Sequence, residues 1–455
     1  MTQAFAHQQL SLQHDTKTPA VFDCSDPGTG KTFVRIMAFA KRRAEGSGAM
    51  LVLAPRSLLR SVWVNDIKKF APHLTVSVAD AANREDAFDA EADVYITNVD
   101  ASKWLAGNTK RFFEKFSELV IDESTAYKHH TSLRSKAIAR ISQYFEHRCC
   151  MTGTPNSNSI TDVWHQAYIL DGGARLGKSF YKFRDSVCTP KQVGNSPNAV
   201  KWTDREGAEE AVFGLLSDIV IRHKFEDCVD IPENYQYVVD YALTKKQQRA
   251  YDELEIDQML TLRGKSPAVL AINAAAVATK LLQVASGAVY DGLGGYHLID
   301  TSRYEMIVDL VEQRKHSLVI FLWKHQRDAL VAEAEKRGIK YAVLDGGSSD
   351  ADRDNIVKGF QAGVYQVIFG HPKTVAHGFT LTRGTATIWS SPTYDLEHFK
   401  QGSKRMHRLG QTQKTETIIV VAKGTIDEKA WEMMEGKNTR MKNLLDLFDS
   451  AQRTD

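Results

Sequence analysis

Short apolar segments alternate with longer segments of mixed polarity through the first third of the chain. This alternation is typical of strands joined by helices, and it predicts a parallel sheet. Each apolar segment ends in polar or small residues, and the ligands of open α/β sheets gather at the carboxyl ends of the strands. We therefore expect a ligand site along that edge. The predicted strands are 20–22, 50–54, 93–97, 118–121 and 149–152.

A second series of the same kind begins at Ser317, and it predicts a second α/β lobe. The segment between the two series reads as mainly helical, with a polar loop near 189–198. The helices predicted in the middle and in the second lobe are 243–262, 268–287, 326–337 and 352–360, and the strands of the second lobe are 318–322, 340–344, 366–370, 387–390 and 417–421.

The expected fold class is therefore α/β, with two tandem lobes of parallel sheet flanked by helices and with helical insertions between them. We place the first lobe at 1–230, including a helical insertion from about 156, and the second at 231–455. A helical segment over about 243–290 precedes the second sheet.

Length, charge and cysteine content narrow the class of protein. A chain of 455 residues is long enough for two or three domains with sizeable cores. A net charge of +2 favours no particular partner, so a nucleic-acid site would have to be a local basic strip. The five cysteines contain no C-x-x-C pair, which predicts reduced thiols and no zinc site. No apolar run approaches the roughly 20 residues of a membrane span, and no signal pattern opens the chain. We expect a cytoplasmic protein without a membrane partner.

The stretch Cys-Ser-Asp-Pro-Gly-Thr-Gly-Lys-Thr at 24–32 lies between a predicted strand and a predicted helix, which is the context of a phosphate-binding loop. Its glycines would let backbone N–H groups converge on phosphate oxygens at the helix N-terminus. Lys31 would then reach the β- and γ-phosphates, and the Thr32 hydroxyl would bind Mg²⁺. Ser25 stands where the usual first glycine would be. A glycine turn that caps an ordinary helix therefore stays open as an alternative.

Two further groups have the chemistry of phosphoryl transfer. Asp122 and Glu123 follow a predicted strand, where an aspartate can order the Mg²⁺ shell and a glutamate can orient and deprotonate the attacking water. Gln401, Arg405 and Arg408 are spaced to share one face of a helix. A guanidinium there could stabilise the charge on a transferring phosphoryl group. The alternatives are a solvated strand end and a basic surface helix.

These motifs resemble those of the Swi/Snf-type branch of the superfamily-two helicases and translocases, almost from end to end of the chain. The string Gln-Gly-Ser-Lys-Arg-Met-His-Arg-Leu-Gly-Gln at 401–411 is similar to the sixth motif of that family and is the most specific signal. The other matching segments are His7-Gln8, Ala-Pro-Arg-Ser-Leu-Leu at 54–59 with Trp63, Ile-Thr-Asn at 96–98, Asp-Glu-Ser-Thr-Ala-Tyr-Lys at 122–128, Thr-Gly-Thr-Pro at 152–155 with Trp164, Ile-Arg-His-Lys at 221–224, and Leu-Thr-Lys-Lys-Gln at 243–247 with Tyr251.

The resemblance implies two RecA-like lobes that bind ATP and Mg²⁺ between them, with the metal at Thr32 and Asp122. The catalytic residues that it implies are Lys31, Asp122 and Glu123, together with Arg405 and Arg408 from the second lobe. Nucleotide contacts are implied for Gln8, Pro27, Gly28, Thr29, Gly30, Lys31, Thr32 and Gly378. Contacts with a nucleic-acid backbone are implied for Arg56, Asn98, Lys128, Thr154 and Thr374.

Some segments depart from the usual pattern of the family. The segment 371–381 lacks the glycine pair that remodelling enzymes usually have, and Asp-Glu-Ser replaces Asp-Glu-Ala-His at 122–124. In both respects the chain looks more like the compact versions carried by bacteriophages and prophages. We expect a motor without a chromatin-reading domain, acting as a monomer, in the host cytoplasm if the source is a phage.

The resemblance leads us to expect an ATP-dependent translocase or helicase that moves along mostly duplex DNA. Contacts with the backbone would make it sensitive to salt and largely blind to sequence. The alternatives are an RNA-directed helicase and a non-catalytic nucleotide switch or scaffold with a decayed motor. Intact Lys31, Glu123 and Arg408 argue against decay. An unrelated phosphate-loop kinase would leave the second lobe and 401–411 without a role.

Overall fold

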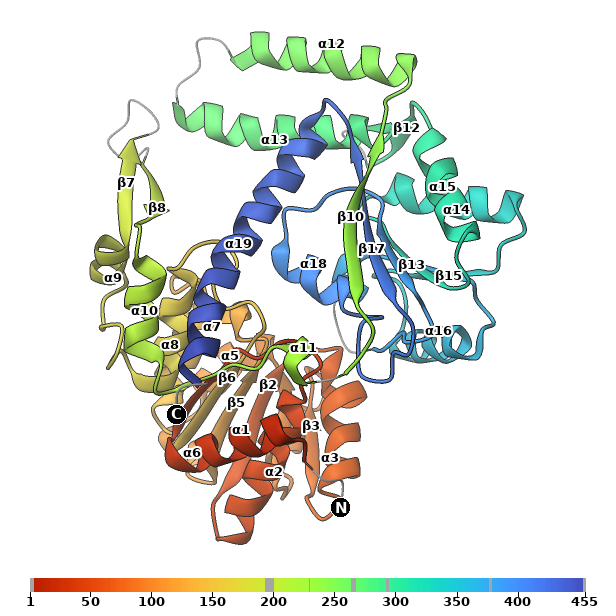
Figure 1. The fold of residues 1–455 in the computed structure, drawn as a ribbon. Coiled ribbons are helices and arrows are strands. Elements are labelled where there is room, and N and C mark those ends of the chain that lie inside the picture. The colour runs from red at the N-terminus through yellow and green to blue at the C-terminus, as the bar shows by residue number, and fades with distance from the viewer. Residues whose placement is uncertain are drawn as a thin grey trace. The chain divides into compact units, whose positions relative to one another are not determined.

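The computed structural model describes residues 4–192, 200–228, 230–262, 267–291, 294–375 and 379–452, and it divides into two compact units (Figure 1). Unit 1 comprises Met1–Thr189, Thr203–Asp230 and Lys437–Asp455, and unit 2 comprises Pro190–Trp202 and Ile231–Gly436.

Unit 1 is built on a seven-stranded sheet in the order β3-β4-β2-β5-β6-β1-β9, and its strand pairs are parallel. Val52 of β2 lies opposite Ile96 of β4 and Val120 of β5, which fixes the register at the centre. Strands β1, β2 and β5 are buried along their whole length and are mainly apolar, although β5 also contains Ser117 and Glu118. The strands are β1 (Ala20–Asp23), β2 (Ala49–Ala54), β3 (Val76–Ala79), β4 (Val94–Asn98), β5 (Phe116–Asp122), β6 (His147–Met151) and β9 (Val220–Ile221).

Helices on this sheet supply the rest of the core of unit 1. Ile36 and Phe39 of α2 enter one apolar cluster with Trp63 of η1 and Ile67 of α3. The helices of the unit are α1 (Ala6–Lys17), α2 (Lys31–Ala44), η1 (Leu59–Val64), α3 (Asn65–Phe70), α4 (Arg84–Asp89), η2 (Val99–Ala101), α5 (Ser102–Gly107), α6 (Lys110–Phe113), η3 (Ser124–Tyr127), α7 (Leu133–Ser142), α8 (Asp162–Asp171), α9 (Phe180–Val187), α10 (Ala208–Leu216) and α11 (Phe225–Cys228). Strands β7 (Cys188–Gln192) and β8 (Val200–Asp204) form a separate two-stranded sheet.

A buried ionic network holds α1 against α2. Asp15 of α1 pairs with Arg35 and with Arg42, both on α2, and the Asp15 and Arg35 side chains are each 3% exposed. Arg42 also reaches Glu118 of β5 through two guanidinium nitrogens, at 2.5 and 2.9 Å. A bidentate pair of this kind fixes orientation as well as distance. The network therefore fixes α1, and with it Gln8, next to the helix that follows the glycine-rich loop.

Unit 2 contains a six-stranded sheet in the order β10-β17-β16-β13-β15-β14, again with parallel pairs. Its strands are β10 (Asn234–Tyr241), β13 (Ser317–Ile320), β14 (Tyr341–Leu344), β15 (Val367–Gly370), β16 (Ala386–Trp389) and β17 (Thr415–Ala422). Its helices are α12 (Lys245–Leu262), α13 (Pro267–Ala285), α14 (Ser302–Glu312), α15 (Lys324–Lys336), α16 (Asp350–Ala362), α17 (Pro372–Val375), α18 (Leu396–Ser403) and the first part of α19 (Ile426–Gln452), and a hairpin joins β11 (Ala288–Tyr290) to β12 (Tyr296–Leu298).

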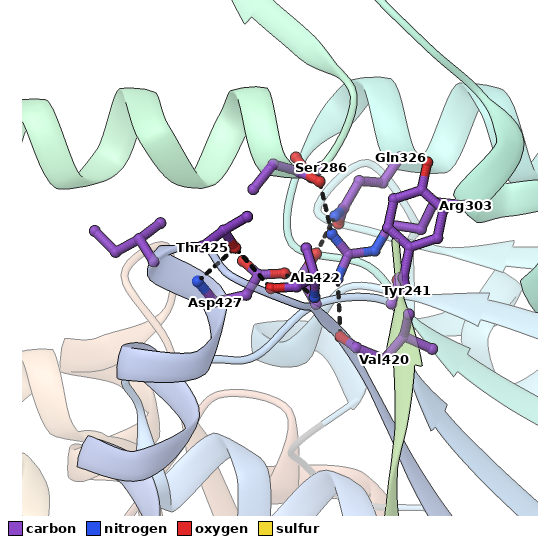
Figure 2. A network of polar contacts seen from close by, with 12 residues as sticks. Tyr241, Ser286, Arg303, Gln326, Val420, Ala422, Thr425 and Asp427 are labelled. Carbon is purple, nitrogen blue, oxygen red and sulfur yellow. Dashed lines mark hydrogen bonds and ion pairs between the residues drawn. The ribbon is translucent and has the colours of Figure 1, made fainter. Parts of the chain in front are cut away.

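The core of unit 2 includes a buried arginine that joins four elements (Figure 2). Arg303 of α14 pairs with Asp427 of α19 at 2.7 Å, and both side chains are 1% exposed. Its guanidinium also donates to the carbonyls of Ala285, at the end of α13, and of Val420, on β17. The Tyr241 ring lies 5.5 Å from the guanidinium. Several partners thus compensate the burial of one charge, as a buried ion requires.

Together the two sheets confirm the predicted fold class, two RecA-like lobes of parallel sheet flanked by helices. No helix among the described residues is long and apolar enough to cross a membrane.

The structure corrects the sequence analysis at two places. Residues 189–192 belong to strand β7 and pair with β8, so they are not loop. Helix α18 ends at Ser403, so Arg405 and Arg408 do not share a helix face with Gln401. If the helix continued, the Gln401 carbonyl would accept a hydrogen bond from the Arg405 backbone amide. It accepts a 2.7 Å bond from the Arg405 side chain, and the Arg405 amide bonds to the Gly402 carbonyl.

Candidate active site

The candidate catalytic groups of unit 1 follow neighbouring strands at one edge of its sheet. The glycine-rich loop follows β1, the Thr-Gly-Thr-Pro segment follows β6, and Asp122 with Glu123 ends β5. These three strands are adjacent in the sheet, and Asp23, Met151 and Asp122 lie in register across them. Parallel pairing therefore brings together three motifs that are spread between residues 24 and 155 of the sequence.

The loop has the backbone form of a phosphate cradle. Gly28 and Gly30 have φ values of 94° and 86°, in the left-handed region that favours glycine, and α2 begins directly at Lys31. The Lys31 ammonium donates to the carbonyls of Ser25, at 2.7 Å, and Asp26, at 3.2 Å. Lys31 thus lies folded over its own loop, and a bound phosphate would offer it a stronger, charged acceptor.

The residues present fit a Mg²⁺ ion that is bound together with a nucleotide. Thr32 lies in the first turn of α2, and Asp122 is a carboxylate at the adjoining strand ends. In the described part of the chain no three His, Cys, Asp or Glu side chains gather as a metal cage. A Mg²⁺ ion at this edge would hence depend on one hydroxyl, one carboxylate, phosphate oxygens and water, the ligand set that this ion accepts.

The start of α1 packs on the glycine-rich loop. Gln8 is 7% exposed, and its side-chain amide donates to the Thr29 carbonyl at 3.3 Å while its side-chain oxygen accepts from the Phe5 amide. The His7 ring contacts the same Thr29 carbonyl at 2.8 Å. A Cβ on Gly30 would lie 2.3 Å from the Gln8 amide nitrogen, so any other residue at this position would displace the Gln8 side chain. The structure therefore brings Gln8 to the glycine-rich loop.

Asp122 is held by an indole. The Trp63 ring N–H donates to Asp122 Oδ2 at 3.0 Å, and Trp63 is fully buried. Burial raises the pKa of Asp122 above its usual value, although the bond from Trp63 and the charge of Lys31 act in the opposite direction. The carboxylate is thus a partly desolvated group with one fixed oxygen, an arrangement suited to binding a cation.

Glu123 is the one non-glycine residue with positive φ in the part of the chain that the structure describes, at φ 54° and ψ 59°. A left-handed conformation at a residue with a long side chain costs roughly 1–3 kcal/mol and is concentrated at functional sites. The next residue, Ser124, is buried, and its hydroxyl donates to Gln166 of α8 at 2.6 Å. The Gln166 amide nitrogen donates in turn to the Pro155 carbonyl at 2.9 Å. Gln166 therefore links the acidic pair to the Thr-Gly-Thr-Pro segment.

That segment also contacts the glycine-rich loop directly. A Cβ on Gly153 would lie 3.0 Å from Pro27 Cδ, so the two motifs approach as closely as glycine permits. Sequence analysis named Thr154 and Pro27 but assigned no role to Gln166. Its position two residues after Trp164 was the only signal that could have drawn attention to it.

The candidate arginines of unit 2 lie in the turn that follows α18. Arg405 is 3% exposed and donates to the carbonyls of Gln401 and Phe379. Arg408 is half-buried and donates to the Lys404 carbonyl and the Thr380 hydroxyl. Both arginines are thus tied to the chain near 379–381. Gly378 lies outside the described residues.

The five candidate nucleic-acid contacts differ in accessibility. Arg56, two residues beyond the end of β2, is exposed, and Asn98 ends the neighbouring strand β4 half-buried, opposite Ala54. The Lys128 ammonium donates to the Ser157 hydroxyl and lies 3.6 Å from an Asp162 oxygen, with a side chain 14% exposed. Thr154 of unit 1 and Thr374, on α17 of unit 2, are buried at 3% and 8% exposure. Arg56 is therefore the most accessible of the five.

The glycine-rich loop lies at the carboxyl edge of one parallel sheet, and a second parallel sheet follows in the chain. This arrangement is typical of two-lobed nucleotide-dependent enzymes. The chain matches the model of the SNF2-related domain over residues 13–286 and the model of the helicase conserved C-terminal domain over residues 302–410. The first match covers more than half of the chain, so the protein belongs to the SNF2-related family. It is accordingly a nucleic-acid-dependent ATPase of the helicase class.

Known proteins similar to the chain differ in length. The p41 protein of Acyrthosiphon pisum secondary endosymbiont phage 1 is 28% identical, over 97% of this chain and 98% of its own length. The chromodomain-helicase-DNA-binding protein 1-like of Danio rerio is 24% identical, over 88% of this chain. The SWI/SNF-related matrix-associated actin-dependent regulator of chromatin subfamily A-like protein 1 of Xenopus laevis is 25% identical, over 90%. This chain spans only 39% and 41% of those two animal proteins.

Among solved structures, the Sulfolobus solfataricus SWI2/SNF2 ATPase core in complex with dsDNA is 21% identical to the chain. The match covers 97% of this chain and 93% of that one, with a TM-score of 0.45.

Proposed function

We propose that the protein is an ATP-dependent translocase that moves along duplex DNA. The observation that carries the proposal is the chain of contacts from Ser124 through Gln166 to the Pro155 carbonyl. It joins the acidic pair, which would act on ATP, to the segment that contains Thr154, a candidate nucleic-acid contact. A motor needs such a link, because ATP turnover does mechanical work only when the two sites depend on each other.

The residues at the strand ends would divide the ATP chemistry among them. Lys31 would hold the β- and γ-phosphates, and Thr32 and Asp122 would hold the Mg²⁺ ion that neutralises phosphate charge. Glu123 would orient a water molecule and accept its proton. Arg405 and Arg408, supplied by unit 2, would stabilise charge on the transferring phosphoryl group. Hydrolysis would then require both units.

DNA would be bound through its phosphates. Arg56, Asn98, Lys128, Thr154 and Thr374 are the proposed contacts, and none of these side chains needs to read a base. Since the Lys128 ammonium already bonds to Ser157, binding a phosphate there would mean exchanging that hydroxyl for a charged partner. The proposal is supported by the helicase and DNA-binding descriptions of the animal relative. We place the activity in the cytoplasm, where ATP and DNA are both accessible.

ATP turnover measured with duplex DNA, single-stranded DNA and RNA tests the proposal, alongside triplex-displacement and strand-separation assays. We expect stimulation by duplex DNA and displacement of the third strand without unwinding. Salt should weaken DNA binding steeply, because phosphate contacts release counterions. The Lys31→Ala variant serves as the matched inactive control.

Each alternative has its own outcome in this experiment. Stimulation by RNA alone would favour the RNA-directed helicase over the DNA translocase. An absence of turnover with every nucleic acid, despite ATP binding, would favour a nucleotide switch. Unwinding in place of triplex displacement would make the protein a strand-separating helicase.

A further inference from the structure

The first half of the glycine-rich loop is bound to a segment almost two hundred residues later in the chain. Arg222 is 5% exposed and pairs with Asp26 of the loop at 2.8 Å. The same guanidinium nitrogen, Nη1, donates to the Cys24 carbonyl at 3.1 Å and to the His223 carbonyl at 3.2 Å. The other Asp26 oxygen accepts from the Phe225 amide at 3.1 Å. Both oxygens of the Asp26 carboxylate are therefore held by the segment 222–225.

Backbone bonds extend this attachment beyond the sheet. Strand β9 pairs with β1, and the ladder continues past both strands as Cys24 N–H bonds to Ile221 O and Asp26 N–H bonds to His223 O. The Ser25 hydroxyl accepts from the His223 amide at 3.1 Å. This bond gives Ser25, which stands where the usual first glycine would be, a role that glycine could not fill.

The second half of the loop is covered by the same segment. The Phe225 ring is fully buried, and a Cβ on Gly28 would lie 3.0 Å from its edge. The His223 ring contacts the Ser11 hydroxyl of α1 at 2.9 Å. One short segment thus touches the loop on both sides of Pro27 and also touches the helix that contains Gln8.

Asp26 is also the residue on which the Lys31 ammonium rests. The Asp26 carbonyl accepts from Lys31, at 3.2 Å, and from the Thr29 hydroxyl, at 2.9 Å. Arg222 thereby fixes, through Asp26, the peptide that positions the lysine of the phosphate site. Without Arg222 the Asp26 carboxylate would lose the 2.8 Å ion pair and the Cys24 carbonyl a hydrogen-bond donor, and the loop could adopt other conformations before a nucleotide binds.

We propose that Arg222 is a positioning residue for nucleotide binding: through Asp26 it holds the phosphate loop in its binding conformation from the segment that leads to unit 2. This inference rests on the proposed function, because it concerns the same ATP site. Arg222 touches neither nucleotide nor DNA in this scheme. A loop held in advance does not have to be ordered by the ligand, so Arg222 contributes to affinity through preorganisation.

The test is a nucleotide-binding titration without nucleic acid, using a fluorescent ADP analogue, together with KM and kcat for ATP with duplex DNA. We expect Arg222→Met to raise Kd for ADP and KM for ATP by about tenfold, with kcat within about twofold. Arg222→Lys should restore affinity, since the three bonds described all come from one nitrogen and an ammonium has three donors.

Arg175→Met is the matched control. It removes an arginine of unit 1 that pairs with Asp171 and Asp218, neither of which is a residue of the loop or of the segment 222–225. We expect its affinity for ADP to equal that of the wild type. Equal losses in Arg222→Met and Arg175→Met would overturn the inference, because they would indicate a general loss of structure. Unchanged ADP affinity in a folded Arg222→Met protein would also overturn it.

If Arg222→Met does not fold, Asp26→Asn makes the same test from the other end of the ion pair, with the same expected rise in Kd. Wild-type affinity in Asp26→Asn would then contradict the inference. The outcome stays separate from that of the proposed function. If the wild-type protein binds ADP but shows no DNA-stimulated turnover, the translocase proposal fails. The ADP affinities of the wild type and of Arg222→Met would still decide the positioning role of Arg222.

Discussion

The indole N–H of Trp63 donates a 3.0 Å hydrogen bond to the carboxylate of Asp122, and both residues are buried, at 0% and 7% exposure. The two residues come from η1 and from the end of β5, and the bond fixes one oxygen of the candidate Mg²⁺ ligand. Groups that orient a metal ligand in this way commonly change metal affinity tenfold or more when they are removed.

We expect Trp63→Phe to raise the Mg²⁺ concentration needed for half-maximal ATP turnover by about tenfold. The variant keeps an aromatic ring but loses the donor, so Asp122 could rotate. The free energy of unfolding should fall by about 1–3 kcal/mol, because a buried acceptor loses its partner. Trp104→Phe, a half-buried tryptophan stacked on Phe88, should leave the Mg²⁺ requirement unchanged. An unaltered Mg²⁺ requirement in Trp63→Phe would show that the bond does not position Asp122.

Glu123→Gln should bind ATP but not hydrolyse it, since the amide cannot accept a proton from water. Glu123→Gly should be equally inactive, yet its free energy of unfolding should stay within about 1 kcal/mol of the wild type. Glycine relieves the left-handed strain at this position, and that relief offsets its greater freedom in the unfolded chain. Equilibrium unfolding and single-turnover kinetics measure the two effects. A strongly destabilised Glu123→Gly protein would mean that the left-handed backbone stores no strain.

Arg408→Ala should reduce DNA-stimulated turnover by about a thousandfold or more while ADP affinity changes little, as expected when an arginine acts only on the transition state. Arg405→Ala should also lose stability, because its buried guanidinium holds the Phe379 and Gln401 carbonyls. Arg383→Ala, an exposed arginine of the same unit, is the control. Normal turnover by Arg408→Ala with DNA present would show that the finger assignment is wrong.

Removing either member of the Arg303–Asp427 pair should destabilise unit 2 by about 3–5 kcal/mol, since the remaining charge stays buried and unpaired. A double variant, Arg303→Met with Asp427→Leu, should lose less than the sum of the single losses. Lys423→Met removes a surface pair with Asp240 and should cost less than about 1 kcal/mol. Denaturant unfolding measures all four variants, and additive losses would contradict direct coupling of Arg303 with Asp427.

His325 should make the protein less stable in acid. Burial lowers the pKa of His325 from 6.5 to about 4, and its ring contacts Ser286 and Tyr290. Because the pKa of His325 is lower in the folded protein than in the unfolded chain, its contribution to the free energy of unfolding is fully present above pH 6.5. That contribution is lost as the pH falls through 4, and the loss amounts to at most about 3 kcal/mol.

The His325→Gln variant isolates this effect. Its unfolding free energy should be lower at pH 7 but should change less between pH 6.5 and 4 than that of the wild type. Other buried histidines, such as His165, remain in both proteins, so the difference in slope belongs to His325. Parallel pH profiles for the two proteins would contradict the prediction.

Sequence patterns predicted the buried strands well because a strand covered on both faces is mainly apolar. Strand β10 escaped prediction for the opposite reason: it lies at an edge of its sheet, and five of its eight side chains are exposed. The positions of Lys31, Asp122 and Glu123 were predicted because each follows a recognisable strand. Gln166 and Arg222 were given no role of their own, although Arg222 lies in the matching segment 221–224, because their partners lie 42 and 196 residues away in the sequence.

The attachment of the glycine-rich loop to the segment 222–225 has a consequence for how the chain matures. The loop is among the first segments to leave the ribosome, but the residues that hold its shape are made about two hundred residues later. A fragment that ends before Ile219 would contain every residue of the phosphate-binding signature and still lack the partners that order it. The nucleotide site of unit 1 is therefore completed late in synthesis. A truncated chain can contain the whole glycine-rich sequence at 24–32 and still lack an ordered phosphate-binding loop.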